Sequence, residues 1–175
     1  MMSNKAVSES FIIRSSDPGD IAQIHAIYQR EVLEGTASFE LTAPDLDEMR
    51  RRRETVINAG FPYLIAAYDE RIAGYAYAST YRPRPAYRFS VENSVYVARW
   101  AQRRGVGGRL LTELIDACCA LGLRQMIAII GDSKHIASIQ LHQKAGFRIV
   151  GTLTNVGFKF ERWLDTVIMQ RSLAD

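Results

Sequence analysis

Residues 91–111 read Val-Glu-Asn-Ser-Val-Tyr-Val-Ala-Arg-Trp-Ala-Gln-Arg-Arg-Gly-Val-Gly-Gly-Arg-Leu-Leu, and this stretch decides the fold. The β-branched, apolar residues that end at Val97 predict a buried strand, and from Leu110 onward the apolar residues recur at helical spacing. Between them lies a basic, glycine-rich turn, residues 102–108. In such a unit, glycines let the backbone approach a ligand, while consecutive amides and the helix dipole favour negative charge. The stretch therefore predicts a phosphate site, and a nucleotide-type cofactor is the first hypothesis.

Length and composition place the chain among ordinary globular proteins. At 175 residues it is long enough to bury a real core, and 47% hydrophobic against 23% charged residues argues against disorder. The net charge of +3 suits an anionic small molecule, but it is too small to indicate a nucleic-acid partner. We expect a single domain over residues 10–172 and a flexible N-terminus over residues 1–9.

The sequence shows no targeting or membrane signal. Residues 1–6 contain no apolar segment of a signal peptide, and no apolar run approaches the roughly 18 residues of a membrane span. The two cysteines, Cys118 and Cys119, are adjacent on a predicted helix, where a bond between them would be strained. We therefore expect reduced, packed thiols, a cytoplasmic location and no membrane partner.

The remainder of the chain alternates between strand and helix patterns. The predicted strands cover residues 11–14, 63–68, 72–80, 90–97, 125–130, 147–152 and 160–170. The predicted helices cover about residues 17–34, 44–59, 105–121 and 135–145. This order predicts an α/β (α+β) fold, a single domain built on one central mixed, mostly antiparallel sheet with helices on both faces.

Two features of the predicted helices are explained by the structure of the helices and not by a bound ligand. The run Arg50-Arg51-Arg52-Arg53 could suggest an anion patch, but carboxylates on both sides of it favour a solvated helix face. His25 shares the first helix with apolar residues, and we expect it to be structural.

Two motifs resemble the GCN5-related N-acetyltransferase (GNAT) superfamily. Residues 102–107, Gln-Arg-Arg-Gly-Val-Gly, match its acetyl-CoA loop, Gln/Arg-x-x-Gly-x-Gly/Ala. Residues 141–147, Leu-His-Gln-Lys-Ala-Gly-Phe, match its downstream Leu-Tyr-x-x-x-Gly-Phe segment. Further segments resemble the branch that acetylates phosphinothricin and methionine sulfone or sulfoximine: 36–40, 75–78, 82–83, 91–97, 137–139, 156–160 and 162–165. Together they span nearly the whole chain, and the resemblance implies the GNAT fold.

The resemblance implies direct acetyl transfer from acetyl-CoA to the α-amino group of a small amino acid or analogue. The strand before the loop would offer backbone groups to the pantetheine arm, and the amides of the loop would hold the pyrophosphate. Arg103 and Arg104 would add charged contacts, unless they are plain surface charge. His135 stands where relatives usually carry an asparagine that contacts the pantetheine. The expected cofactor-binding residues are Val95, Tyr96, Val97, Arg103, Arg104, Gly105, Val106, Gly107, Gly108 and His135.

Two residues are candidates for proton transfer. Glu92 is the only carboxylate in the strand that leads to the cofactor loop, and the resemblance places a glutamate there in phosphinothricin acetyltransferases. Its apolar neighbours would raise its pKa, which suits a general base acting directly or through a water; alternatively, it only orients the amine. His142 stands where many members of the superfamily carry a tyrosine near the CoA sulfur. It would either give a proton to the leaving thiolate or pack as a core residue.

The acceptor site is predicted from one loop and two aromatic residues. Arg82 is the natural partner for a carboxylate, since a guanidinium binds that group bidentately, although an exposed arginine in a proline-rich loop is the alternative. Phe39 and Tyr77 would supply an apolar wall. The expected substrate-binding residues are Phe39, Tyr77, Arg82, Pro83, Arg84, Glu92, Asn93 and Ser94. No metal site is predicted.

Other partners and functions stay open. Residues 158–163 mix aromatic and basic side chains, which can indicate single-stranded nucleic acid, but a closing strand, a pocket edge or a dimer surface is favoured. The resemblance implies a homodimer. Transfer to a protein N-terminus or a polyamine is one alternative function. A non-catalytic acyl-CoA-binding regulatory module is another, and it would need the loop 103–108 but no working base.

Overall fold

The computed structural model describes residues 11–174, so the flexible N-terminus expected over residues 1–9 lies outside the described residues. In chain order the elements are β1 (Ile12–Ser15), η1 (Pro18–Asp20), α1 (Ile21–Glu34), α2 (Leu46–Asn58), β2 (Tyr63–Tyr68), β3 (Arg71–Thr80), η2 (Pro85–Tyr87), β4 (Ser90–Val97), η3 (Arg99–Ala101), α3 (Val106–Ala120), β5 (Gln125–Gly131), α4 (Ile136–Lys144), β6 (Arg148–Lys159) and β7 (Arg162–Ser172).

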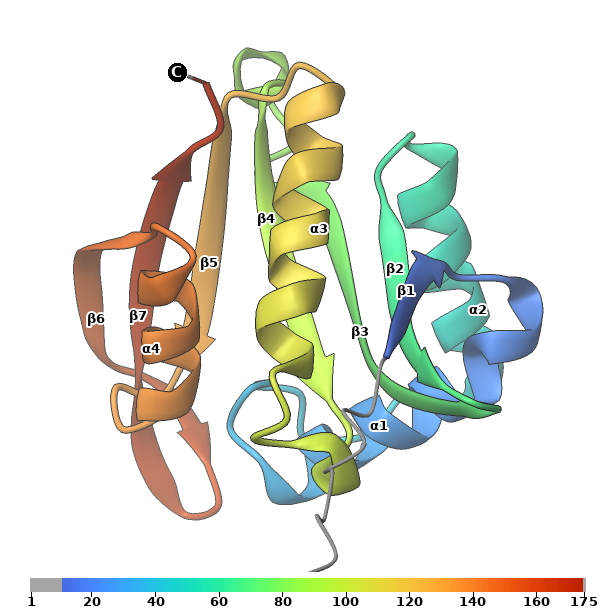
Figure 1. Ribbon diagram of the computed structural model, residues 1–175. Helices are drawn as coiled ribbons and strands as arrows, with labels where there is room; N and C mark the ends of the chain where they lie inside the picture. Colours follow the sequence, from blue (N-terminus) through green and yellow to red (C-terminus); the bar gives the residue numbers. More distant parts are fainter. Residues whose placement is uncertain (1–10, 175) are drawn as a thin grey trace, which may run out of the picture.

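The strands form one seven-stranded sheet in the order β1-β2-β3-β4-β5-β7-β6. Neighbouring strands are antiparallel except for β4 and β5, which run parallel. Figure 1 shows α3 and α4 on one face of this sheet and α1 and α2 on the other. The predicted α/β (α+β) class, with a mixed, mostly antiparallel sheet and helices on both faces, is confirmed.

Each face of the sheet has its own apolar core. The stripe that α3 buries, Val106, Leu110, Leu111 and Leu114, follows the three- and four-residue steps seen in the sequence. On the other face, α1 buries a stripe against β2 and β3. Its members are Ile21, Ile24, Tyr28 and Val32. The spacing of apolar residues thus decides which side of each helix meets the sheet.

Strand boundaries near the C-terminus differ from the prediction. The strand predicted to end at Thr152 continues as β6 to Lys159, because a register shift between Leu153 and Gly157 interrupts its alternation before pairing with β7 resumes. The next strand begins at Arg162 rather than at Phe160. Phe160 and Glu161 have φ of 52° and 58°, so they form the hairpin turn.

Both N-terminal helices begin later than predicted. The turn Pro18–Asp20 forms a short 3-10 helix with a capping box before α1 starts at Ile21. The second helix starts at Leu46, because the Asp45 side chain accepts from the Glu48 amide and caps it.

The arginine run is only partly the solvated face that the sequence predicts. Arg50, Arg51 and Arg52 pair with carboxylates at the surface. Arg53 is a correction: it is 8% exposed and donates to the Ser16 hydroxyl at 2.8 Å and to the Ser16 carbonyl at 2.6 Å. It therefore fixes α2 to the end of β1.

Other structural expectations are met in part. The His25 ring contacts the Pro44 carbonyl through Nε2 at 2.9 Å, consistent with a structural role. Both cysteines are free, but only Cys118 is packed, and burial raises the pKa of its thiol to about 12; Cys119 is exposed. Among residues 11–174, no helix is long and apolar enough to cross a membrane.

The parallel strands β4 and β5 position the site because they pair over only part of their length. Their register covers Ser90–Asn93 against Gln125–Ala128. Beyond that point β4 stays with β3 as far as Val97, whereas β5 stays with β7 as far as Gly131. The two strands therefore diverge, and the β5-facing edge of residues 94–97 has no strand partner among the described residues.

Candidate active site

A cavity of about 330 Å³ lies where β4 and β5 diverge. Its walls come from β3, β4, β5 and β7, the loop between α1 and α2, and α4 with the loop before it. The lining residues are Ala37, Ser38, Phe39, Tyr77, Glu92, Asn93, Ser94, Val95, Tyr96, Ala128, Ile129, Ile130, Gly131, His135, Ser138, His142 and Thr166. Within residues 11–174, no cluster of three or more His, Cys, Asp or Glu could hold a metal ion.

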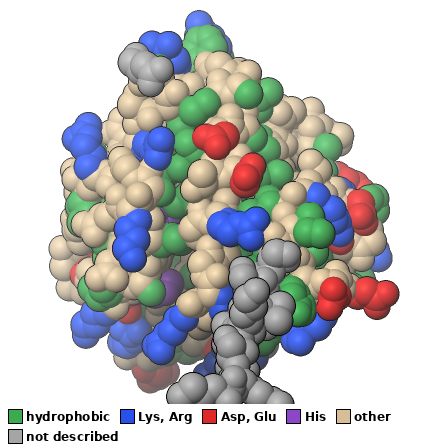
Figure 2. Space-filling view, in the orientation of Figure 1, with side chains coloured by type: hydrophobic (Ala, Val, Ile, Leu, Met, Phe, Trp, Pro, Cys, Tyr) green, Lys and Arg blue, Asp and Glu red, His purple; other side chains and the backbone are tan. Residues whose placement is uncertain are grey.

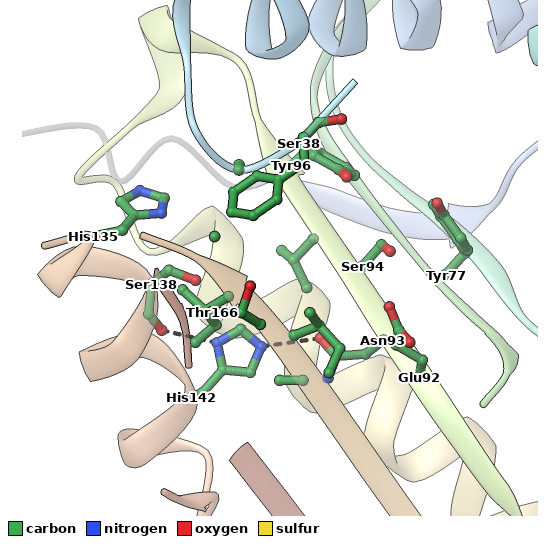
Figure 3. Close-up of a pocket in the computed structure, with 17 residues that line it drawn as sticks. Ser38, Tyr77, Glu92, Asn93, Ser94, Tyr96, His135, Ser138, His142 and Thr166 are labelled. Carbon is green, nitrogen blue, oxygen red and sulfur yellow. Dashed lines mark hydrogen bonds between the residues drawn. The ribbon is translucent and has the colours of Figure 1, made fainter. Parts of the chain in front are cut away.

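One side of the cavity carries Glu92, Ser94 and Tyr77 (Figure 3). Glu92 and Ser94 are two residues apart on β4, so they share one face of the sheet. Tyr77, on the neighbouring strand β3, is the register partner of Ser94. Burial raises the pKa of Glu92, and the positive charge of Arg82 partly opposes that shift. This is the environment that a carboxylate needs to accept a proton near neutral pH.

The opposite side of the cavity carries His142, which is 5% exposed. Nδ1 contacts the Ser138 carbonyl at 2.8 Å, and Nε2 contacts the Asn93 Oδ1 at 3.0 Å (Figure 3). The Asn93 amide nitrogen donates in turn to the Ile127 carbonyl at 3.1 Å. Asn93 thus joins β4, β5 and α4 at the point where the strands part, so its contacts within the protein are with the scaffold.

The His142 contacts bear on its protonation. Both ring nitrogens face oxygen acceptors, which suits a protonated ring, whereas burial lowers the pKa of His142 below its usual value. Burial is the larger influence, so the resting ring is neutral. A neutral ring can donate at only one nitrogen, and a second proton would find an acceptor already in place. Packing therefore accounts for His142 in the folded protein, and proton donation by it stays a prediction.

His135 is the N-cap residue of α4, and it also lines the cavity. Its Nδ1 atom is buried and lacks a hydrogen-bond partner among the described residues. Buried polar atoms are nearly always paired, so this nitrogen is suited to a polar group of a bound molecule.

The loop between β4 and α3 has the backbone shape that the glycine-rich motif predicts. Arg103 and Gly105 have φ of 62° and 80°, and Gly105 precedes the first residue of α3, whose first turn has no side-chain cap. A Cβ on Gly107 would lie 3.4 Å from side-chain atoms of both Val97 and Leu141, so α3 begins close against β4 and α4. The first-turn amides at residues 106–108 are therefore free of intrahelical partners and able to bind an anion.

Charge around that loop is consistent with an anionic ligand. Arg103 and Arg104 are both exposed. On the face that carries α3 and α4, Lys and Arg side chains gather along the left and lower parts (Figure 2). Such a surface favours approach of a phosphate-bearing molecule.

Arg82, Pro83 and Arg84 are exposed and do not line the cavity. The Arg82 guanidinium lies 4.7 Å from the centre of the Tyr81 ring and donates to the Tyr81 carbonyl at 3.3 Å. Its charge nevertheless acts on Glu92. Arg82 is thus near the Glu92 side of the cavity, while nothing comparable connects Pro83 or Arg84 to it.

Most of the predicted residues from β4 meet in this one cavity, as do Phe39, Tyr77, His135 and His142. Val97, at the end of β4, and residues 103–108, which lead into α3 and begin it, do not line this cavity. The prediction missed Ser138 and Thr166 as wall residues, and it missed the glycines Gly131 and Gly157, on either side of Phe39. A small residue inside a strand is the one signal in the sequence that marks such close contacts.

The chain matches the family described as acetyltransferase (GNAT) domain over residues 13–168. It belongs to the GNAT acetyltransferases. This GNAT chain is 53% identical over 154 residues to phosphinothricin N-acetyltransferase of Alcaligenes faecalis, covering 88% of this chain and 78% of that relative. It is 39% identical over 162 residues to L-methionine sulfoximine/L-methionine sulfone acetyltransferase of Pseudomonas aeruginosa, covering 92% and 94%.

Among solved structures, this GNAT chain is similar to a GNAT superfamily phosphinothricin acetyltransferase from Sinorhizobium meliloti in complex with AcCoA. The TM-score is 0.91 at 44% sequence identity, covering 94% of this chain and 89% of that one. The predicted family, fold and enzyme class, an N-acetyltransferase that uses acetyl-CoA, are therefore confirmed.

Proposed function

We propose that this GNAT chain acetylates the α-amino group of a small amino acid or analogue of the phosphinothricin or methionine sulfone/sulfoximine type. The observation that carries the proposal is the cavity of about 330 Å³ with Glu92 in its wall. A volume near the lower end of small-molecule sites suits a compact acceptor better than a peptide. The relatives at 53% and 39% identity bear these acceptors in their names.

The residues around the cavity fit acetyl-CoA. The unpaired edge of residues 95–97 would bind the amides of the pantetheine arm, and the amides of residues 104–108 would hold the pyrophosphate. The buried, unpartnered Nδ1 of His135 suits a further polar contact. Acetyl-CoA, when bound, supplies an acetyl thioester that an amine can attack.

The chain's own residues would prepare the amine. Glu92, with its pKa raised by burial, would accept the proton that the ammonium must lose, directly or through a water. Arg82 would bind the acceptor carboxylate from the edge of the same site, because a guanidinium matches that group with parallel hydrogen bonds. Tyr77 and Phe39 would form the wall beside the acceptor side chain. His142 would have to take up a second proton before it gave one to the leaving thiolate, and the ring would then return to its neutral form.

The proposal extends to assembly and location. Large apolar side chains are exposed on the β6–β7 hairpin, which supports a homodimer formed through this surface. Its members are Val156, Phe158, Phe160 and Trp163. The free thiols of Cys118 and Cys119 are consistent with a reducing, cytoplasmic location.

Acetyl-CoA turnover against a panel of amines tests the proposal. We expect turnover with phosphinothricin, methionine sulfone or methionine sulfoximine, and little with peptides or polyamines. Preference for a peptide or polyamine would overturn the choice of acceptor. Coenzyme A binding by calorimetry, without turnover of any amine, would instead favour the regulatory module.

A further inference from the structure

A lysine of β6 holds the loop between α1 and α2 in place. Lys159 is 4% exposed, and its Nζ donates to the Gly35 carbonyl at 2.9 Å and to the Ser38 carbonyl at 2.6 Å. An ammonium removed from water needs such acceptors, so the loop and the lysine stabilise each other. These bonds fix segment 35–40, part of which lines the cavity, at its first residue and at the residue before Phe39.

Phe39, which this segment carries, lies between two strand glycines. A Cβ on Gly157 of β6 would lie 2.7 Å from the Phe39 Cδ2, and a Cβ on Gly131 of β5 would lie 2.7 Å from the Phe39 Cε1. Real Cβ atoms do not approach that closely, so Gly157 admits no side chain while the ring stays in place, and at Gly131 the Thr36 carbonyl oxygen of the same loop lies closer still. The ring occupies a slot that the two strands leave for it.

The same loop is also fixed to α1. The Tyr28 hydroxyl lies 2.9 Å from the Ser38 hydroxyl and donates to Glu40 at 2.9 Å. Ser38 is 7% exposed. The segment 35–40 is therefore held by α1 on one side and by β5 and β6 on the other.

We propose that Lys159, Gly131 and Gly157 form a latch that positions loop 35–40, and with it Phe39, as the wall that selects the acceptor. Lys159 is in this sense a positioning residue, because it touches the loop and not the reacting atoms. The proposal rests on the proposed function, since the wall matters only for an acceptor bound in this cavity. Displacing such a wall by about 1 Å can cost roughly 100-fold in rate.

Two alanine substitutions on one strand give a matched test. Gly157→Ala places a methyl group against the Phe39 ring, whereas Gly151→Ala, also on β6, meets nothing within 4 Å. We expect Gly157→Ala to raise the acceptor KM roughly tenfold or more. Gly151→Ala should leave it unchanged, and acetyl-CoA affinity should be unchanged in both. Equal acceptor KM values for the two variants would overturn the latch.

A second pair of variants tests the lysine. Lys159→Met should raise the acceptor KM in the same way, whereas Lys144→Met, at an exposed residue in the last turn of α4, should not. In a Phe39→Ala background the further effect of Gly157→Ala should vanish, because the ring it displaces is gone. Persistence of the full Gly157→Ala effect in that background would contradict the steric explanation.

Hydrogen exchange over residues 35–40 provides a readout that needs no acceptor. Lys159→Met and Gly157→Ala should each speed exchange of these amides relative to Gly151→Ala, while exchange in α3 stays slow. If the wild-type chain acetylates no amino acid, the proposed function fails, and this comparison still decides the latch. Unchanged exchange in both variants would refute the latch even in an active enzyme.

Discussion

The carboxylate of Glu92 is subject to two opposing influences on its pKa: burial raises it, and Arg82 lowers it. If Glu92 is the base, Glu92→Gln removes the proton acceptor and keeps the size of the side chain. We expect kcat to fall roughly 100-fold or more, with acetyl-CoA affinity unchanged. Steady-state kinetics and calorimetry measure the two quantities. An undiminished kcat at pH 7–8 would remove Glu92 from proton transfer.

Arg82→Ala should act on the acceptor. Losing a charged hydrogen bond to the acceptor carboxylate should raise KM by an amount equivalent to about 1.5–3 kcal/mol. Arg88→Ala is the control, because Arg88 is also exposed in this region and stacks on Phe89 instead. If both variants leave the acceptor KM unchanged, the carboxylate is bound elsewhere.

The pH dependence of Arg82→Ala provides a separate prediction. A base works when deprotonated, so kcat/KM falls as pH drops through the Glu92 pKa, which burial places above its usual 4.5. Removing the positive charge of Arg82 raises that pKa further, so the acid limb of the profile should move to higher pH. Using one acceptor for both proteins cancels the titration of the amine itself. A limb that stays in place would show that another group controls it.

Single residues show where sequence reasoning succeeds and where it stops. The raised pKa of Glu92 was predictable because a lone carboxylate among apolar strand residues has an unusual environment, whereas its role as a base stays a prediction. Lys159 and Arg53 were not, because their partners lie far away in the sequence and only the folded chain brings them together. From the sequence, Arg53 was interpreted as part of a solvated helix face, and Lys159 as part of a closing strand, a pocket edge or a dimer surface.

At the scale of elements, the position of the end of β4 depends on how closely β3 approaches it. A Cβ on Gly74 would lie 2.7 Å from the Tyr96 carbonyl oxygen and 3.3 Å from the Val97 Cα. Gly74→Ala should therefore push the end of β4, lower the free energy of unfolding by about 1–3 kcal/mol and weaken coenzyme A binding. Thermal denaturation and calorimetry measure these changes. Coenzyme A affinity equal to that of Gly151→Ala would show that β4 absorbs the methyl group.

Periodicity predicted the elements whose apolar pattern is regular, and it ended β6 too early because the pattern of that strand is interrupted. The apolar stripes of α1 and α3 repeat without interruption, so their faces were correct. β6 was cut short because its bulge, with Asn155 at φ 54°, disrupts the alternation on which strand prediction depends. The pattern of residues does not show where β4 and β5 diverge, because each strand taken by itself has a regular pattern.

At the scale of the whole molecule, the β6–β7 hairpin exposes a pair of aromatic side chains that contact each other with their rings tilted. Phe158 and Trp163 are 54% and 62% exposed, with ring centres 5.0 Å apart. If this surface forms the homodimer, sedimentation should give twice the chain mass of 19.7 kDa. The double variant Phe158→Asp, Trp163→Asp should sediment as a monomer.

Leu33→Asp is the control for that experiment. Leu33 is 55% exposed on α1 and lies outside the hairpin, so the variant should remain a dimer. A wild-type protein with the mass of one chain would contradict the proposed assembly. A dimer that survives the double variant would place the interface on another surface.

The limited pairing of β4 with β5 has a mechanical consequence. Four residue pairs, reinforced by Asn93, connect a half made of β1 to β4 with a half made of β5 to β7. This short stretch of pairing resists twisting less than the longer ladders β2–β3, β3–β4, β5–β7 and β6–β7. A molecule that bridges the opening below it acts as a brace between the halves, so ligand occupancy should stiffen the entire sheet and raise its melting temperature.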